Sequence, residues 1–467
     1  EEKFIFASEI KSILSHNVPR ELNKKALDLY FSLKYVPFVE TLFKSIFKLP
    51  PSSYLKFDLK KNKLEIKKYW SIKFNNKNQK PKSVLAQELR YLIEENVKSR
   101  LISDVPIGAF LSGGIDSSSI VGIMSKYMEN PVKTFSIGFE EGAPINELNY
   151  AKLVSDHFNT DHTELLVKAS IYEILPNLIW YLDDLISDAA FIPVFFMAKH
   201  AREKMTVALS GDGADEILSG YSGYYQTNIN GIITKIPKFI PKNLMKFYKL
   251  IPSFTGKLIL SYLNRSKTNI DRFLRTISLP DEEKAILASF QTESVQDIIK
   301  SKIPKDLDDI NQIISWDLQY QLPNQYNMKL DKMTMAASLE ARVPFLDYKI
   351  VEWASSIPSN LKLKGNCEKY ILKLAMKDLL PDSILKRKKL GFSTPMSFWL
   401  KTGLKGISEY LLKKLSKRTD IVNPYYIQKI NKNRLKKSYE NRTWNLLMFE
   451  IWYETFFENN ELKPLSF

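Results

Sequence analysis

The sequence predicts an α/β protein whose centre is a doubly wound parallel sheet. From Val84 to Leu209, segments with the apolar pattern of strands alternate with segments of helical spacing. Two polar loops follow predicted strands directly, at the sheet edge where ligands of such folds bind. We expect a β-rich segment over residues 1–80 before this part, and a mostly helical, lysine-rich part from about Gly220 onward.

The expected elements of residues 1–80 are strands. Apolar and polar residues alternate from Leu55 to Lys60, which is typical of a half-buried strand. A turn at Lys61-Asn62 leads into a second apolar run, so the pattern predicts a hairpin. The stretch Phe4–Phe6 is also strand-like, and the polar stretch Asn75–Lys82 is predicted to be a linker.

The central part predicts strands and helices in regular succession. In chain order they are a strand ending at Gly108–Leu111, a helix with apolar residues from Ile120 to Met128, a strand at Val132–Gly138, a helix at Leu148–Phe158, a strand at His162–Val167, helices around Leu175–Leu182 and Val194–Lys204, and a strand at Thr206–Leu209. This order favours βα units and a parallel sheet.

Composition sets wider limits. With 467 residues and 44% apolar residues, the chain can form two or three domains with a large core. It has no apolar run long enough to cross a bilayer, so we expect a soluble protein. The single cysteine, Cys367, excludes an intramolecular disulfide framework and fits a reducing cytoplasm. Because lysine is spread along the chain, the net charge of +16 indicates a solvated surface, and we expect no nucleic-acid partner.

The first polar loop has the residues of a phosphate-binding turn. Its sequence is Ser112-Gly113-Gly114-Ile115-Asp116-Ser117-Ser118, between a predicted strand and a predicted helix. Glycines allow a tight turn, while backbone N–H groups, hydroxyls and the helix N-terminus suit a pyrophosphate group. The Walker A pattern is absent. Asp116 fits beside phosphate if a metal ion lies between them. The alternative is a Ser/Gly turn in which Asp116 caps the helix.

The second polar loop is Ser210-Gly211-Asp212-Gly213-Ala214-Asp215-Glu216, again directly after a strand. Three carboxylates in five residues are costly to hold together without a cation. Mg²⁺ shared with phosphate oxygens would supply that cation. The alternative is an acidic surface turn.

Two later segments carry charge. Residues 329–347 include Lys329, Asp331, Lys332, Glu340, Arg342 and Asp347 between apolar residues, which predicts a helix with buried ionisable groups near its end. A salt-bridged helix end is the alternative. In 387–393, three cations precede a Gly-Phe turn, an arrangement that could close over a triphosphate. A plain basic loop is the alternative there.

Several motifs in order resemble glutamine-hydrolysing asparagine synthetase of the bacterial B type. They are DVPIGAFLSGGIDSS (104–118), VALSGDGADEILSGY (207–221), SLEARVPFLD (338–347), RKKLGF (387–392) and LLMFEIWYETF (446–456). FIFASEIKSIL (4–14) and KLPPSSYLKFD (48–58) resemble the tail of the family's N-terminal glutaminase domain. The resemblance implies an Ntn-hydrolase glutaminase remnant over 1–80 and a synthetase domain of the ATP-pyrophosphatase (adenine nucleotide alpha hydrolase-like) fold over 84–467.

The resemblance implies a reaction and its cofactors. The side-chain carboxylate of aspartate would attack ATP, pyrophosphate would leave, and ammonia from glutamine would displace AMP from the acyl-adenylate. Mg²⁺ would be held by Asp116 and Asp215. Asp212 would take a proton from the attacking ammonia, although glutamate stands there in some members. Lys389 would neutralise phosphate charge during adenylation.

The same resemblance implies nucleotide contacts. The pyrophosphate part of ATP would be held by Ser112, Gly113, Gly114, Ser117 and Ser118. The adenine and ribose pocket would be lined by Phe110, Leu111, Ile137, Gly138, Ser210 and Gly211. A homodimer is an open alternative for the assembly.

Other functions stay open. Alanines and a phenylalanine at 189–191 replace the small hydroxyl residues of many relatives, so the acceptor could be another carboxylate, such as a sugar acid or a peptide. A tRNA-modifying enzyme with a pyrophosphatase loop and a degenerate binding module are remoter alternatives. The chain begins Glu1-Glu2-Lys3, and its only cysteine is Cys367. We therefore expect ammonium rather than glutamine as nitrogen donor, and 1–80 as the least stable part.

Overall fold

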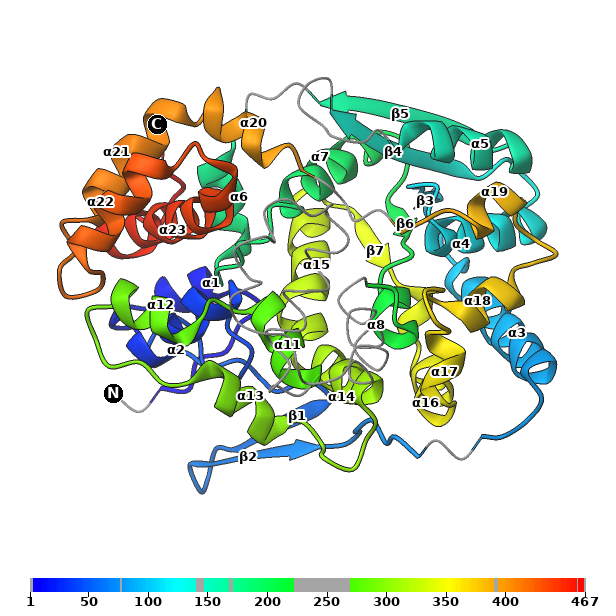
Figure 1. Ribbon diagram of the computed structural model, residues 1–467, viewed down its shortest axis with the longest axis horizontal. Coiled ribbons are helices and arrows are strands. Elements are labelled where there is room, and N and C mark those ends of the chain that lie inside the picture. Colours follow the sequence, from blue (N-terminus) through cyan, green and yellow to red (C-terminus); the bar gives the residue numbers. More distant parts are fainter. Residues whose placement is uncertain are drawn as a thin grey trace, which may run out of the picture.

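A five-stranded parallel sheet lies in the right-hand half of the view in Figure 1. The computed structural model describes residues 3–75, 78–139, 147–167, 171–221, 269–389, 394–459 and 461–465. In spatial order the strands are β5 (Asp161–Val167), β4 (Lys133–Phe139), β3 (Ile107–Phe110), β6 (Val207–Leu209) and β7 (Glu340–Arg342). Every neighbouring pair is parallel, which confirms the predicted parallel sheet.

The chain adds strands first on one side of β3 and then on the other side. From β3 it moves outward to β4 and β5, and it then returns to form β6 on the other side of β3. Ala109 of β3 therefore has Thr134 of β4 on one side and Leu209 of β6 on the other. Such a reversal opens a crevice beyond the carboxyl ends of the two strands. Both predicted polar loops leave the sheet there.

Helices cover both faces of the sheet, because alternate strand residues point to opposite sides. Ala109 and Leu209 belong to one apolar core, and Phe110 and Ala208 belong to the other. The first core includes residues of α3 (Lys82–Arg100), α4 (Ile115–Tyr127), α5 (Leu148–Phe158), α8 (Ala214–Leu218), α16 (Tyr348–Ser356) and α18 (Tyr370–Ala375). The second includes residues of α6 (Leu175–Leu182), α7 (Phe191–Ala201) and α15 (Asn327–Ala336).

The first 80 residues are not β-rich, so that expectation was wrong. The described part contains α1 (Ile10–Leu14), α2 (Lys24–Leu33) and one hairpin, and Phe4–Phe6 form no strand. Helix α2 is buried from Ala26 to Leu33, and the side chain of Asn23 caps it by accepting from the Ala26 N–H at 3.2 Å. The helix packs into the second core, with the Tyr30 hydroxyl donating to the backbone oxygen of Asn445 at 2.9 Å.

The predicted hairpin is confirmed. Strands β1 (Ser53–Asp58) and β2 (Lys63–Lys68) pair antiparallel, with Leu55 opposite Ile66. All of β2 is exposed to solvent, including Leu64 and Ile66.

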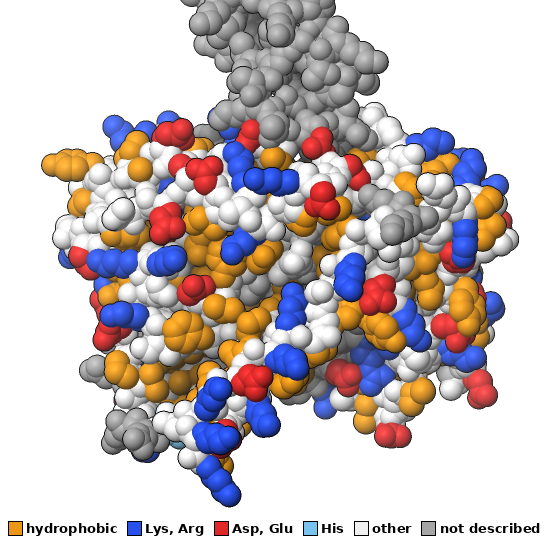
Figure 2. Space-filling model, turned by 90° about the horizontal axis from the view of Figure 1, so that it is seen from below, with side chains coloured by type: hydrophobic (Ala, Val, Ile, Leu, Met, Phe, Trp, Pro, Cys, Tyr) orange, Lys and Arg blue, Asp and Glu red, His pale blue; other side chains and the backbone are white. Residues whose placement is uncertain are grey.

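Viewed from below Figure 1, hydrophobic side chains lie among lysines, arginines and carboxylates that are scattered rather than gathered in one block (Figure 2).

The second half of the described chain is mostly helical, as expected. Besides the helices named above, it contains α11 (Asn269–Ile277), α12 (Asp281–Leu287), α13 (Val295–Lys302), α14 (Asp309–Trp316), the π-helix η2 (Asp317–Tyr326), the 3-10 helix η3 (Pro344–Leu346), α17 (Ser359–Lys362), α19 (Asp382–Leu385), α20 (Met396–Lys401), α21 (Lys405–Leu415), α22 (Pro424–Asn433), the 3-10 helix η4 (Lys437–Tyr439), α23 (Glu440–Tyr453) and the π-helix η5 (Glu454–Glu458). Figure 1 shows α15 between the sheet and the group formed by α2, α6 and α23.

The charged segment 329–347 is α-helical only in its first part. Helix α15 ends at Ala336, and Glu340–Arg342 form the edge strand β7, which the sequence did not predict. Within this strand Arg342 and Glu340 pair with each other, Nε to Oε1 at 2.7 Å. No helix within the described ranges is both long and apolar enough to span a bilayer.

Candidate active site

The two polar loops meet at the reversal point of the sheet. The first connects β3 to α4, and the second connects β6 to α8. They touch at Gly211, where an added Cβ would lie only 2.7 Å from the backbone nitrogen of Ser117. A cavity of about 290 Å³ opens beside them. A larger cavity of about 700 Å³ lies between the N-terminal segment and η2, but neither loop lines it. The polar loops therefore identify the smaller cavity as the candidate site.

The first loop is a tight turn stabilised by its own hydroxyl groups. Gly113 has a φ of +66°, and its Cα packs against the backbone of Tyr150. The backbone N–H of Ser112 donates to Oγ of Ser117 at 3.2 Å. Gly114 is the N-cap of α4, without a side-chain cap, so Asp116 does not serve as the helix cap. The structure therefore disfavours the plain capping interpretation and leaves Asp116 to another role.

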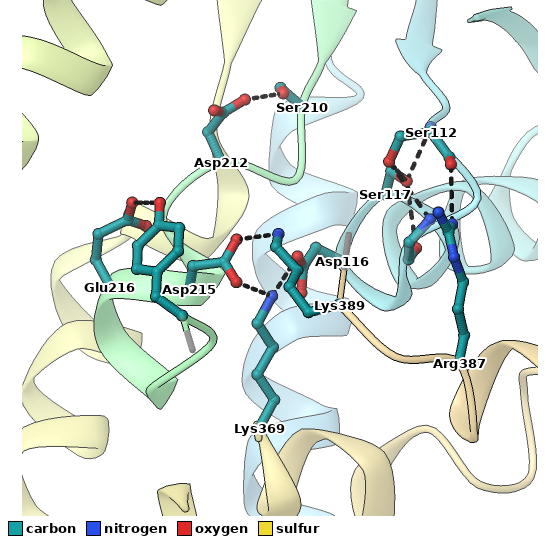
Figure 3. Close-up of polar contacts among 12 residues, drawn as sticks. Ser112, Asp116, Ser117, Ser210, Asp212, Asp215, Glu216, Lys369, Arg387 and Lys389 are labelled. Atoms are coloured by element: carbon teal, nitrogen blue, oxygen red, sulfur yellow. Dashed lines mark hydrogen bonds and ion pairs between the residues drawn. The ribbon is translucent and has the colours of Figure 1, made fainter. Parts of the chain in front are cut away.

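The second loop separates its three carboxylates. Asp212 accepts from Oγ of Ser210, and Glu216 accepts from the Tyr221 hydroxyl, whereas Asp215 faces Asp116 (Figure 3). Burial, followed by the negative charge of Asp215, raises the pKa of Glu216 to about 8. The loop therefore divides its acids between different partners, and only Asp215 approaches the first loop.

Two lysines supply the cations that the acids require. The Lys369 amine lies 2.5 Å from Oδ2 of Asp116 and 2.5 Å from Oδ1 of Asp215, and the Lys389 amine lies 2.7 Å from Oδ2 of Asp215 (Figure 3). Burial opposes ionisation of Asp215, but the two lysine charges outweigh it and lower its pKa to about 2. Burial dominates at Asp116 and raises its pKa. The acids are thus held by protein cations.

A third basic residue fixes the first loop from outside. Arg387 donates from Nη1 to the backbone oxygen of Ser112 at 3.2 Å, and its other amino group pairs with Glu147. The guanidinium also lies 4.1 Å from the ring centroid of Tyr150. In the predicted basic turn, Arg387 therefore clamps the loop and Lys389 enters the site. Residues 390–393 of that prediction lie outside the described residues.

The cavity wall also carries a buried ion pair. Lys329 of α15 lies 2.7 Å from Asp188, Nζ to Oδ2, and Oδ1 of Asp188 accepts from the backbone N–H of Ala190 at 3.1 Å. Burial disfavours both charges, yet each offsets the cost for the other, so the pKa of Lys329 is raised and that of Asp188 is lowered. The lining of the same cavity also includes the apolar residues Ala190, Val194 and Met197.

Most predicted nucleotide-site residues reach the walls. The lining of this cavity includes Phe110, Leu111, Ser112, Asp116, Ser117, Ile137, Ser210, Gly211, Asp212, Asp215 and Lys389. Gly114 lines a smaller adjoining cavity of about 60 Å³. Of the other residues predicted there, Gly113 packs against Tyr150 and Gly138 against Leu148, while the hydroxyl of Ser118 is buried. These three lie behind the walls.

Only one charged residue of segment 329–347 reaches the cavity. Its other charged side chains make structural contacts. Lys332 lies 3.6 Å from Asp183, Arg342 donates at 2.8 Å to the Ile102 carbonyl, and Asp347 pairs with Arg100 at 3.0 Å. The salt-bridge interpretation therefore holds for most of this segment.

The two facing acids suit a metal ion that also binds a substrate. Oδ1 of Asp116 is buried and has no hydrogen-bond partner within the described part of the chain. No group of three or more acidic, histidine or cysteine side chains in the described ranges could hold a metal alone. Mg²⁺ commonly uses one or two carboxylates plus phosphate oxygens. Asp116 and Asp215 fit that pattern.

Sequence reasoning missed Lys369. It lies 253 residues from Asp116, and no spacing rule links the two. The one available signal is an isolated lysine next to a glutamate and a cysteine, in GNCEKY, which is too common to be informative. The Asp188–Lys329 pair was missed as a pair, although each residue lies in a segment singled out for its unusual charges or replacements.

Comparison with known proteins gives two family matches. A model described as "Asparagine synthase" matches residues 88–454, and one described as "Glutamine amidotransferase domain" matches residues 1–70. The chain is 33% identical to "Asparagine synthetase [glutamine-hydrolyzing] 1" of Bacillus subtilis over 462 residues, covering 97% of this chain and 72% of that protein.

Two further relatives show the range of similarity. "Putative asparagine synthetase [glutamine-hydrolyzing]" of Mycobacterium tuberculosis is 29% identical over 96% of this chain and 70% of its own length. "Amidase chry2" of Gibberella zeae is 24% identical over 88% of this chain and 68% of its own length.

Proposed function

Because the chain belongs to the asparagine synthase family, we propose that it activates a carboxylate with ATP and transfers the acyl group to ammonia. Family membership places it among the ATP-using carbon–nitrogen ligases that take their nitrogen from glutamine. The observation that supports the proposal best is the meeting of the two polar loops, with Asp116, Asp215 and Lys389 within one site. The family's ATP-pyrophosphatase fold is our assignment for 84–467, and an Ntn glutaminase remnant is our assignment for 1–80.

The first proposed step is adenylation. A carboxylate oxygen of the acceptor bonds to the α-phosphorus of ATP, the bond to the bridging oxygen breaks, and pyrophosphate leaves. Ser112, Gly114 and Ser117 would hold the departing group through hydroxyls and the N-terminus of α4. Lys389 would offset the charge that shifts onto the leaving group.

Asp116 and Asp215 are the proposed ligands of Mg²⁺. When bound, the ion would screen the phosphate charges and hold the triphosphate in one orientation. Phe110, Leu111 and Ile137 would contact the base and ribose, since they form the apolar part of the wall next to the first loop.

The second proposed step is amidation. Ammonia bonds to the acyl carbon, the carbon–oxygen bond to AMP breaks, and a proton leaves the nitrogen. Asp212 lines the same cavity and is the proposed acceptor of that proton. Its carboxylate already accepts a hydrogen bond from Ser210, which helps to hold its orientation (Figure 3).

The Asp188–Lys329 pair supports an amino-acid acceptor. An α-amino acid carries one ammonium and one carboxylate, so its ammonium can bind Asp188 while its carboxylate binds Lys329. The side-chain carboxylate would then be free to reach ATP, as aspartate requires. The apolar neighbours Ala190 and Val194 favour the second candidate, amidation of a bulkier carboxylate. A relative named as an amidase is consistent with such variation within the family.

One experiment tests the proposed function directly. Labelled pyrophosphate is incubated with the chain, ATP, Mg²⁺ and a panel of acceptors that includes aspartate, other amino-acid carboxylates and sugar acids. We expect label to enter ATP only when a cognate acceptor is present, and amide to form when ammonium is added. No acceptor-dependent exchange across the panel would contradict the proposal. Exchange with a sugar acid but not aspartate would select the second candidate.

A further inference from the structure

Lys369 occupies the space between the two proposed metal ligands. Its amine lies 2.5 Å from a carboxylate oxygen of Asp116 and 2.5 Å from one of Asp215. Only 3% of the Lys369 side chain is exposed, compared with 12% and 13% for the two acids. In such a buried position solvent and salt screen the charges little. The lysine is therefore the main counter-ion that brings the two acids together.

The backbone at Lys369 and Gly220 positions the lysine side chain between the two acids. Lys369 has a φ of 51° and a ψ of 39°, a left-handed conformation that residues other than glycine seldom adopt. Gly220 faces it. A Cβ at Gly220 would lie 2.1 Å from Cε of Lys369 and 1.8 Å from Oδ1 of Asp215, so any side chain at position 220 would displace the pair. An unusual backbone conformation and a glycine thus combine to place one amine.

The charges of the cluster already balance without a metal ion. Asp116 and Asp215 contribute two negative charges, and Lys369 and Lys389 contribute two positive charges. A divalent cation between the acids would compete with Lys369 for the same oxygens and would leave a buried excess of positive charge. That excess is costly unless an anion accompanies the metal ion. A triphosphate is such an anion.

The Lys369 side chain also borders a second cavity. It lines the cavity of about 60 Å³ next to the first loop, together with Gly114 and Ser112. A phosphate group bound on that loop would offer the amine new oxygens within the same small space. The lysine can therefore exchange a carboxylate partner for a phosphate partner by a side-chain movement alone.

We propose that Lys369 is an internal counter-ion that holds Asp116 and Asp215 together until ATP binds. A divalent cation then enters between the acids together with the triphosphate, which takes over the lysine. This inference rests on the proposed metal ligands. It predicts that the nucleotide-free protein binds divalent cations poorly, and that removing the lysine charge improves that binding. A lysine with only a packing role, or only a phosphate-binding role, would not have this effect.

The test measures Mn²⁺ binding to the full chain without nucleotide, from the electron paramagnetic resonance signal of free Mn²⁺. We expect Lys369→Met, which keeps the aliphatic stem, to bind Mn²⁺ at least about tenfold more tightly than the unmodified chain. Lys373→Met is the matched control. Lys373 lines the same small cavity, but its amine lies near Sγ of Cys367, at 3.8 Å, so the affinity should not change.

The thermal unfolding midpoint gives a second readout. Lys369→Met should unfold at a lower temperature than the unmodified chain, and Mn²⁺ should raise its midpoint more. If the methionine variant does not fold, Lys369→Gln keeps a hydrogen-bond donor without the charge and replaces it in both measurements.

Equal Mn²⁺ affinity in the lysine variant and the unmodified chain would overturn the inference. The proposed function has a separate check, in which Mn²⁺ is added with an ATP analogue whose α,β bridge is methylene. Nucleotide-dependent Mn²⁺ binding that is lost in Asp215→Asn supports the metal ligands even if Lys369 proves irrelevant. No Mn²⁺ binding under either condition would overturn the metal ligands and the inference together.

Discussion

The Lys389 amine lies 2.7 Å from Oδ2 of Asp215, although 174 residues separate the two along the sequence (Figure 3). Lys389 stays charged although it is buried. Asp215 and Asp116 together raise its pKa despite the cost of desolvation. A permanent cation therefore faces the place where we expect the phosphates to react. Its contribution should be larger in the transition state than in the bound ground state.

We predict that Lys389→Met lowers the rate of AMP formation from bound substrates by about 100-fold or more, which is the usual effect of removing one charged transition-state contact. ATP affinity should weaken far less. Rapid-quench single turnovers and equilibrium nucleotide binding measure the two quantities separately. Lys388→Met is the control, since Lys388 makes no ion pair with Asp215 in the described structure. A collapse of affinity with an unchanged rate would make Lys389 a binding residue only.

Asp116→Asn should abolish ATP–pyrophosphate exchange and leave the fold intact. The amide keeps the shape of the side chain but loses the charge that a metal ion needs. Lys369 would still pair with Asp215, so the circular dichroism spectrum should stay the same. The melting temperature should fall, because one buried positive charge loses its partner. Asp331→Asn changes an exposed carboxylate on α15 and should leave exchange unaffected. Normal exchange in Asp116→Asn would exclude this residue as a metal ligand.

Lys329→Met should raise the KM for the acceptor by about tenfold or more, because a charge-assisted contact is lost. The KM for ATP should change by less than about threefold. The matched control is Lys332→Met on the same helix. Lys332 pairs with Asp183, and that variant should lower the melting temperature without changing either KM. If Lys329→Met affected both substrates equally, the acceptor would not bind at this ion pair.

Lys362 makes stability depend on pH. Its amine is fully buried and donates to Oδ1 of Asn311 at 2.7 Å, and burial lowers its pKa to about 7. The unfolded lysine keeps its ordinary pKa of 10.5, so between about 7 and 10.5 the unfolded chain binds more protons than the folded one. The free energy of unfolding should therefore rise with pH across this window, by at most about 1.4 kcal/mol per pH unit.

Urea unfolding at several pH values checks this prediction. The difference in stability between the unmodified chain and Lys362→Met should grow in favour of the unmodified chain as the pH rises. Lys364→Met, which changes an exposed lysine nearby, should show no such trend. A pH-independent difference for Lys362→Met would mean that the lysine stays charged when folded.

The periodic segments were the predictable part of the fold. Helix α6 begins and ends where the pattern placed it, at Leu175–Leu182, and β4 and β5 differ by a residue at their ends. Local patterns suffice there because each segment carries its own apolar face. Strand β7 was missed because its three residues have no such pattern, and its position depends on β6. Helix α2 had a helical pattern, but we interpreted residues 1–80 as strands.

The site was predictable where its residues are close in sequence. The loops at Ser112 and Ser210 follow neighbouring parallel strands, so their meeting follows from the sheet order. The partners of their acids could not be predicted. Lys369 and Lys389 come from segments after α17 and α19, and only tertiary packing brings them to Asp215.

The contact between Tyr30 and Asn445 sets the order in which the molecule can form. The two residues are 415 positions apart, and Tyr30 lies on α2 while Asn445 lies on α23. During synthesis on the ribosome, α2 emerges long before α23, with Leu27, Tyr30 and Phe31 on an apolar face. The helix that covers this face is made more than 400 residues later.

Folding of this half of the core must therefore wait until synthesis has passed α23. Until then the apolar face of α2 is open to chaperones or to self-association, because transiently exposed apolar surface aggregates. A pairing so distant in sequence also carries a high loop-closure cost before its contacts contribute, which slows folding. Helix α2 is thus synthesised long before α23 and reaches its final packing only after it.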